Sequence, residues 1–158
     1  MQRQAGFTIV EMLIVVTILA LLAGVLVPVL NDSAATSRDA RRSADLKAVQ
    51  SALEAFKRVN GEYPTTDDSW SVENGTNKNY GANGYIKDLV PTFLPALPKD
   101  PNEKTEFGTD GYSYRSDGTD FKFLAKSTPE SFPAGNPFYD PSGIKKNWQV
   151  SSPGGYHW

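Results

Sequence analysis

The chain of 158 residues contains no cysteine and a single histidine, His157. Without cysteine, disulfides, thiolate metal sites and a cysteine nucleophile are excluded. A single histidine leaves no cluster of imidazole metal ligands, and a Ser-His-Asp arrangement would have to use His157, near the end of the sequence. We interpret His157 as a solvated side chain, and a domain with this composition must be held together by its apolar core or by a metal ion.

Sequence motifs of nucleotide binding and of acid–base catalysis are also missing. The sequence has no phosphate-binding loop and no dinucleotide fingerprint. Asp117 and Asp120 form a close pair of carboxylates, but Ser116-Asp117-Gly118-Thr119 has turn composition, which accounts for both. The net charge is −2, without the clustered basic face that nucleic-acid binding requires. We therefore predict no enzyme and no nucleic-acid partner.

Charge is scarce in one stretch, Gly6 to Leu30, where Glu11 is the only charged residue. An apolar run of more than about 18 residues predicts a membrane-spanning helix, and we place it at residues 7–30. A carboxylate inside such a helix costs several kcal/mol unless it finds a partner. Glu11 is therefore a candidate functional residue.

A secretory signal peptide does not explain this stretch, because the apolar run is too long and the small residue precedes it. A simple signal anchor, held by Arg3 on the cytoplasmic side, leaves Glu11 and the Gly6-Phe7 boundary unexplained. The stretch Gly6-Phe7-Thr8-Ile9-Val10-Glu11 resembles the G-F-[ST]-x-x-E signature of the type IV pilin-like family. This family comprises the pilins and the pseudopilins of type II secretion.

The resemblance implies a defined maturation. Residues 1–6 would be a leader that a prepilin peptidase removes between Gly6 and Phe7, and Phe7 would then be N-methylated. Glu11 would meet the amino terminus of a neighbouring subunit, which compensates both charges and fixes the register between subunits. The implied partners are identical or related subunits, an assembly ATPase, a membrane platform protein and, before assembly, membrane lipid.

We expect residues 31–158 to form the soluble part. It should begin with an amphipathic helix, residues 31–60. Pro28 predicts a kink in the long helix, because proline removes a hydrogen bond and clashes with the preceding turn. Asn60-Gly61 predicts a left-handed helix end. Between residues 31 and 60, apolar residues recur at helical spacing and form a stripe facing a core: Leu46, Val49, Leu53, Phe56 and Val59.

The second half of the chain predicts a small antiparallel sheet. Residues 111–126 alternate, turn and alternate again, which is typical of a hairpin, and residues 147–151 are the best candidate for a third strand. Residues 62–109 have loop composition, with Trp70, Val72 and Tyr80 expected to anchor them to the core. The predicted fold class is α+β: a long N-terminal helix packed on a small antiparallel sheet, as in pilins.

Two features remain open at this stage. Arg38, Arg41 and Arg42 could contact lipid headgroups or acidic patches on other subunits, or form a solvated helix face. Calcium is the one metal to consider, because the resemblance to major pseudopilins implies a calcium site in a C-terminal loop. No ligand can be assigned, and the role of ordinary turn residues is favoured over calcium binding for the acids near the sheet: Asp110, Asp117, Asp120 and Asp140.

The expected function is a structural subunit of a type II secretion pseudopilus, anchored in the inner membrane of a bacterium with its N-terminus in the cytoplasm. It would later form part of a periplasmic or extracellular filament. The absence of cysteine argues against pilins that close a loop with a disulfide, and the Leu97-Pro98-Lys99-Asp100-Pro101 run resembles major pseudopilins. The alternatives are a type IV pilus subunit for adhesion, motility or DNA uptake, and a membrane-tethered binding module.

Overall fold

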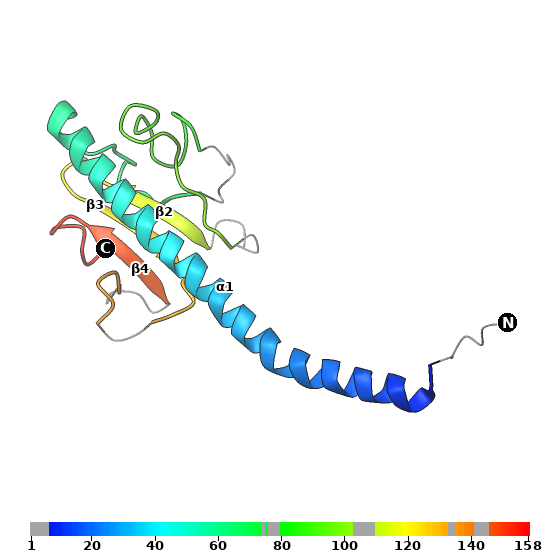
Figure 1. Cartoon of the computed structure of the whole chain (residues 1–158). Coiled ribbons are helices and arrows are strands. Elements are labelled where there is room, and N and C mark those ends of the chain that lie inside the picture. Colours follow the sequence, from blue (N-terminus) through cyan, green and yellow to red (C-terminus); the bar gives the residue numbers. More distant parts are fainter. Residues whose placement is uncertain (1–6, 74, 76–79, 103–109, 133–134, 141–145) are drawn as a thin grey trace. The chain divides into compact units, whose positions relative to one another are not determined.

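The computed structural model describes residues 7–73, 75, 80–102, 110–132, 135–140 and 146–158. The elements follow the order α1 (Ile9–Asn60), β1 (Ser71–Val72), β2 (Gly111–Ser116), β3 (Phe121–Lys126) and β4 (Asn147–Ser151). Contacts divide the chain into two units, Met1–Thr36 and Ser37–Trp158, and α1 contributes residues to both. The α+β fold class predicted from the sequence is confirmed (Figure 1).

Helix α1 ends where the sequence predicts. Gly61 adopts φ +88°, and its N–H donates to the carbonyl of Lys57 at 2.8 Å. A left-handed residue at this position satisfies a carbonyl that the last helical turn leaves without a partner. The helix is continuous through position 28. The side chain of Pro28 lies outside the described part, so the kink stays a prediction.

The four strands form one antiparallel sheet in the order β1-β2-β3-β4. The predicted hairpin is confirmed: Tyr114 lies opposite Phe123, and Gly118 makes the turn with φ +91°. The predicted third strand is β4, where Val150 lies opposite Phe123. The sequence interpretation missed β1, which has only two residues and pairs Ser71 with Tyr114.

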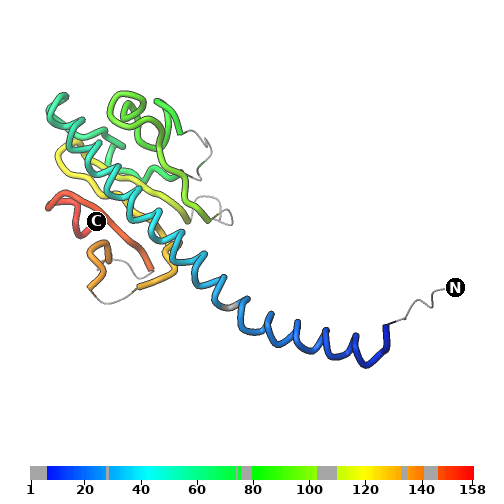
Figure 2. Tube along the Cα trace, viewed as in Figure 1, coloured from blue at the N-terminus to red at the C-terminus, as the bar shows by residue number. Residues whose placement is uncertain are grey.

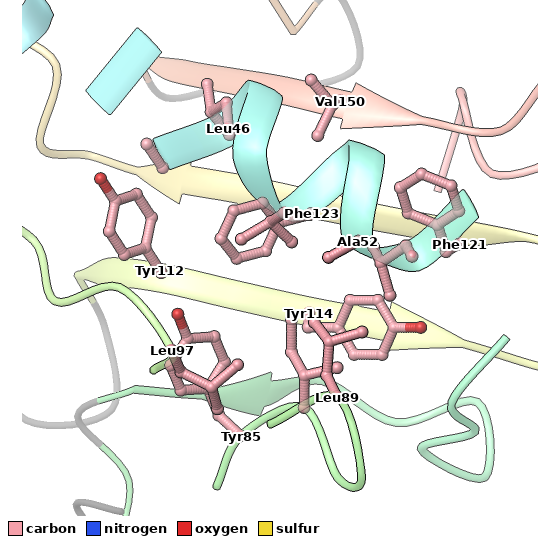
Figure 3. Packing of buried hydrophobic residues seen from close by; sticks show 14 of the residues in the cluster. Leu46, Ala52, Tyr85, Leu89, Leu97, Tyr112, Tyr114, Phe121, Phe123 and Val150 are labelled. Carbon is pink, nitrogen blue, oxygen red and sulfur yellow. The ribbon is translucent and has the colours of Figure 1, made fainter. Parts of the chain in front are cut away.

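The core lies between the part of α1 in the head, by which we mean Ser37–Trp158, and one face of the sheet (Figure 3). Leu46, Val49 and Leu53 are fully buried against aromatic side chains of β2 and β3, among them Tyr112 and Phe123. The segment before β2 adds Ile86, Leu89 and Leu97 to the same cluster. The amphipathic stripe therefore has the partner that its spacing predicts.

Tyrosines form much of this core, and their hydroxyl groups have partners. Tyr112 donates to Asp45 at 2.8 Å, and Tyr63 donates to Glu54 at 2.9 Å, so two turns of α1 are bonded to the rest of the head. Tyr114 and Tyr85 donate to main-chain carbonyls, of Pro64 and Pro98 respectively. A buried hydroxyl without a partner costs about 1–3 kcal/mol, so these bonds make a tyrosine-rich core tolerable.

Two expectations about the core are wrong. Val59 is 73% exposed, and it lies one residue before the end of α1. Trp70 is 41% exposed and so does not anchor its loop in the core. Tyr80 does pack against the core, where its ring meets that of Tyr85 at 6.4 Å.

Leu53 and Val59 offer a matched pair of variants on one helix. Leu53→Ala should lower the free energy of unfolding by about 3 kcal/mol, because it leaves a cavity in a close-packed core. Val59→Ala should change it by less than about 0.5 kcal/mol. Urea unfolding of the full chain in detergent micelles, followed by tryptophan fluorescence, measures both values. Equal effects of the two variants would contradict the core described above.

Candidate functional site

The start of α1 is closed by reciprocal hydrogen bonds between Thr8 and Glu11. The Thr8 backbone N–H and hydroxyl donate to Glu11 Oε2 at 2.8 and 2.7 Å. The Glu11 backbone N–H in turn donates to the Thr8 hydroxyl oxygen at 3.2 Å. This is a capping box, in which the first and fourth residues satisfy N–H groups that a helix start leaves without partners.

The capping box explains how an isolated chain accommodates a carboxylate in an apolar helix. Both bonds from Thr8 end on one oxygen, Oε2. Oε1 of Glu11 accepts no hydrogen bond from any residue in the described part of the chain. The side chain is thus held in place while one oxygen stays available to a further donor.

The first unit buries almost none of its apolar surface within the chain. Every residue from Phe7 to Leu30 for which burial is described is exposed, including Phe7 at 76% and Ile9 at 87%. Helix α1 is the one helix in the described chain that is long and apolar enough to cross a membrane. Side chains with this exposure need an apolar partner outside the chain, either lipid or other protein.

One of the cleavage-site residues predicted from the sequence cannot be placed. Gly6 lies outside the described residues, and so does the peptide bond at which the leader would be cut. Phe7 and Glu11 are described, and Phe7 precedes the first helical residue, Ile9. The structure therefore places Glu11 at the helix start, while cleavage and methylation stay predictions.

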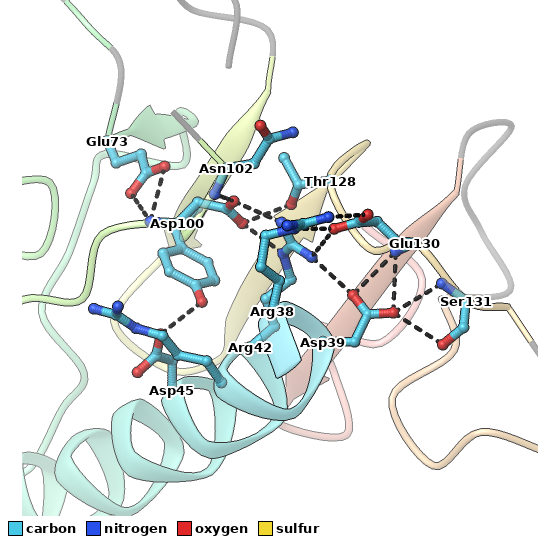
Figure 4. Close-up of polar contacts among 12 residues, drawn as sticks. Arg38, Asp39, Arg42, Asp45, Glu73, Asp100, Asn102, Thr128, Glu130 and Ser131 are labelled. Atoms are coloured by element: carbon cyan, nitrogen blue, oxygen red, sulfur yellow. Dashed lines mark hydrogen bonds and ion pairs between the residues drawn. The ribbon is translucent and has the colours of Figure 1, made fainter. Parts of the chain in front are cut away.

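In the head, a buried guanidinium attaches α1 to the loops around it (Figure 4). Arg42 is fully buried and forms a bidentate pair with Asp100 at 2.8 and 2.9 Å. It also donates to Asp39 at 2.7 Å. Asp100 accepts a further bond from the hydroxyl of Thr128. Because a buried charge is tolerated only when it is paired and hydrogen-bonded, these residues stabilise one another.

The loop after β3 is attached to the same turn of α1. Arg38 makes a bidentate pair with Glu130 at 2.5 and 2.6 Å. Asp39 accepts bonds from the backbone N–H groups of Glu130 and Ser131. The sequence-based view of Arg42 as part of a surface basic cluster is wrong. Its charge is used inside the head, and Arg41 keeps only a long contact with Asp45, at 3.9 Å.

Glu73 is a second buried acid, next to this network. It is 2% exposed, and its carboxylate accepts the backbone N–H of Asp100 at 3.0 Å. Burial raises the pKa of Glu73 to about 7, because loss of water penalises the charged form more than that N–H stabilises it. Gly111 lies against the carboxylate with φ +98°, and a Cβ there would collide with it.

Acidic side chains do not form a metal centre in the described part of the chain. No three acidic or histidine side chains there are grouped so that they could hold a metal ion. Asp117 accepts backbone N–H bonds from Thr119 and Asp120, which is ordinary turn chemistry. His157 is exposed, and its ring contacts that of Tyr156.

Comparison with known families decides the identity. A family model described as "Prokaryotic N-terminal methylation motif" matches residues 1–27, and one described as "Type II secretion system (T2SS), protein G" matches residues 29–128. This chain belongs to the type II secretion protein G family. It is therefore a pseudopilin, a structural subunit of a secretion system and not an enzyme.

Three relatives of this pseudopilin carry one and the same name. "Type II secretion system core protein G" of Vibrio cholerae serotype O1 is 37% identical over 123 residues, covering 75% of each chain. The protein of that name from Pseudomonas aeruginosa is 33% identical over 125 residues, 74% of this chain and 87% of its own. That from Klebsiella pneumoniae is 35% identical over 108 residues, 64% and 71% respectively. No solved structure matches this pseudopilin.

Family membership decides between the functions left open by the sequence. The resemblance to major pseudopilins is confirmed, and the pilus subunit and the tethered binding module are set aside. Assembly with related pseudopilins follows from the family. The sequence interpretation had used Glu11 but missed Thr8 as its partner. The signal was present, because Thr8-x-x-Glu11 is a capping-box pattern before an apolar run.

The buried carboxyl of Glu73 predicts a pH dependence of stability. Its pKa in the fold, about 7, is above its ordinary value of 4.5. The folded state therefore holds the proton more tightly, and this stabilisation is complete below pH 4.5 and lost as the pH rises through 7. Between these values the free energy of unfolding should fall by about 3 kcal/mol relative to Glu73→Gln.

Urea unfolding across this pH range measures the difference. Glu62→Gln is the control, since Glu62 is exposed and should leave the wild-type pH profile unchanged. A Glu73→Gln variant with the same pH profile as the wild type would show that Glu73 does not bind the proton.

Proposed function

We propose that this pseudopilin is processed before Phe7 and then polymerises through its apolar helix into a filament of identical and related subunits. The observation that carries the proposal is Glu11, a carboxylate held by Thr8 at the start of a helix whose residues up to Leu30 are exposed wherever their burial is described. An ordinary membrane anchor gains nothing from such a residue, since an acid in lipid only adds cost.

In the proposed assembly, the apolar helices leave the membrane and pack against one another, with the heads outside. The Glu11 carboxylate then faces the ammonium group of a neighbour's Phe7. Opposite charges in a medium of low dielectric constant attract strongly, and each compensates the other. The Thr8 bonds occupy Oε2 alone, so the capping box and the pair between subunits are compatible.

The proposal includes the machinery that the family signature implies. A prepilin peptidase cuts between Gly6 and Phe7 on the cytoplasmic side and Phe7 is N-methylated. An assembly ATPase and a membrane platform protein drive insertion into the filament. The head lies on the periplasmic side of the inner membrane before assembly. Family membership and the apolar helix support this location.

The mass of the mature chain tests the processing step. In cells with an active prepilin peptidase, the intact protein should lack residues 1–6 and carry one methyl group on Phe7. In cells without the peptidase it should keep the full mass. Mass spectrometry of the purified protein measures both, and an uncut chain in the presence of the active peptidase would contradict the proposal.

Variants of Glu11 test the charge pairing. Glu11→Ala should be processed normally, but filament yield should fall at least about tenfold, because the neighbouring ammonium would be buried without a partner. Filaments sheared from cells overproducing the system, compared with the total processed protein, give the yield.

Glu11→Gln separates the charge from the helix cap. Glutamine can replace glutamate in a capping box, so the helix start should persist while the negative charge is lost. We expect this variant to assemble as poorly as Glu11→Ala. Normal filaments from Glu11→Gln would show that the cap alone suffices and that no charge pair holds the subunits.

A further inference from the structure

Lys122 is the second residue of β3 and is fully buried, which is rare for a lysine. Its ammonium group donates to Asp140 Oδ1 at 3.1 Å and to the main-chain oxygens of Trp158 at 2.7 Å and Tyr156 at 3.3 Å. These acceptors come from two segments on either side of β4. One ammonium group therefore joins three parts of the chain that are distant in sequence.

The side chain of Lys122 points away from α1. Residues alternate between the two faces of a strand, and its neighbours Phe121 and Phe123 belong to the core beneath the helix. Lys122 therefore lies on the outer face of the sheet. Residues 152–158 turn back after β4 (Figure 2), and main-chain oxygens of this segment accept hydrogen bonds from the buried ammonium group.

Residues 152–158 are built to lie against β3. The hydroxyl of Ser152 donates to Asp120 at 2.6 Å and accepts the backbone N–H of Phe121 at 2.9 Å. The backbone of Gly155 approaches that of Phe121 so closely that any Cβ would collide with its carbonyl. These contacts direct the main-chain oxygens of the segment toward the ammonium group of Lys122.

Among the described residues, the acceptors of the Lys122 ammonium group include the carboxylate of Asp140 and main-chain oxygens. Calcium selects this kind of oxygen from loops near one another. Here a positive charge already lies 3.1 Å from Asp140. A divalent cation bound to the same carboxylate would be a few ångströms from an ammonium group, and the two charges would repel strongly in a site of low dielectric constant.

The other acids near the sheet and α1 are also committed. Asp120 accepts Ser152 and the N–H of Gly154, while Asp100 and Glu130 are paired with buried or half-buried arginines. Among the described residues, no group of three acids is left that could hold a metal. The charge distribution of this head therefore does not fit a calcium site at Asp140.

We propose that the ammonium group of Lys122 is the structural cation of this head. It takes the place that a divalent metal would need, and it joins residues 152–158 and Asp140 to β3. It follows that the fold of the head is independent of calcium. It also follows that loss of this ammonium group weakens the attachment of residues 152–158 and Asp140 to the outer face of the sheet.

Thermal unfolding of the full chain in nonionic detergent tests the proposal, with near-UV circular dichroism of its tryptophans as the signal. The wild type should unfold at the same temperature in EGTA and in millimolar calcium, and calorimetric titration should detect no calcium binding. A rise in Tm with calcium that EGTA reverses, or calcium binding by the wild type, would overturn the proposal.

Variants test the role of the ammonium group itself. Lys122→Met keeps an unbranched side chain of similar size but removes the ammonium group next to the buried carboxylate of Asp140, and Tm should fall by about 10 °C. Lys126→Met, on the same strand but only partly buried, should leave Tm unchanged. Equal Tm values for Lys122→Met and the wild type would refute the role.

A double variant distinguishes charge from packing. Adding Asp140→Asn to Lys122→Met removes the unpaired carboxylate, so Tm should recover in part; a further fall would show that Lys122 acts through packing alone. If Lys122→Met does not fold, Asp140→Asn alone is compared with the wild type. It should lower Tm, because the ammonium group would lose a charged acceptor, and an unchanged Tm would contradict the proposal.

Discussion

The first half of α1 has no apolar partner within its own chain, and this constraint governs the rest of the molecule. Side chains from Phe7 to Leu30 are exposed wherever their burial is described. Lipid or neighbouring subunits must cover them. The head consequently cannot use this surface for its own stability. It must fold around the second half of α1 alone, with a core, ion pairs and a closed sheet face of its own.

The head meets this requirement with charge as well as with apolar packing. Leu46, Val49 and Leu53 fill the space between α1 and the sheet, and Arg42 extends from the same helix to Asp100 in a loop far along the chain. On the opposite face of the sheet, Lys122 likewise connects β3 to a segment that is distant in sequence. In a chain without cysteine, two buried cations thus connect segments that disulfides could otherwise join.

The sequence predicted the elements whose signals are local. The hairpin 111–126, the strand 147–151 and the helix end at Gly61 follow from alternation and from turn residues. The sequence-based prediction failed where contacts between distant residues determine the structure. Arg42 reads as a surface residue because its partner Asp100 is 58 positions away, and a strand of two residues such as β1 has no detectable period.

The functional residues, like the fold, could be predicted from the sequence only in part. Glu11 stands out because it is one charge in an apolar run, and the Thr8 capping box is visible in the sequence as a pattern. The role of Lys122 is not visible, because alternation places it on the outer face, where a lysine is ordinarily solvated. In the structure it is buried, and main-chain oxygens of residues 152–158 accept its hydrogen bonds.

The tyrosine hydroxyls give the head a mechanical property. Tyr112 and Tyr63 attach the loop and sheet side of the head to α1 at Asp45 and Glu54, nine residues apart along the helix. Anchors at two heights resist rotation of this helical segment about its axis as well as sliding along it. A torque or an axial pull on this part of α1 is therefore transmitted to the sheet, so that helix and sheet respond to load as one body.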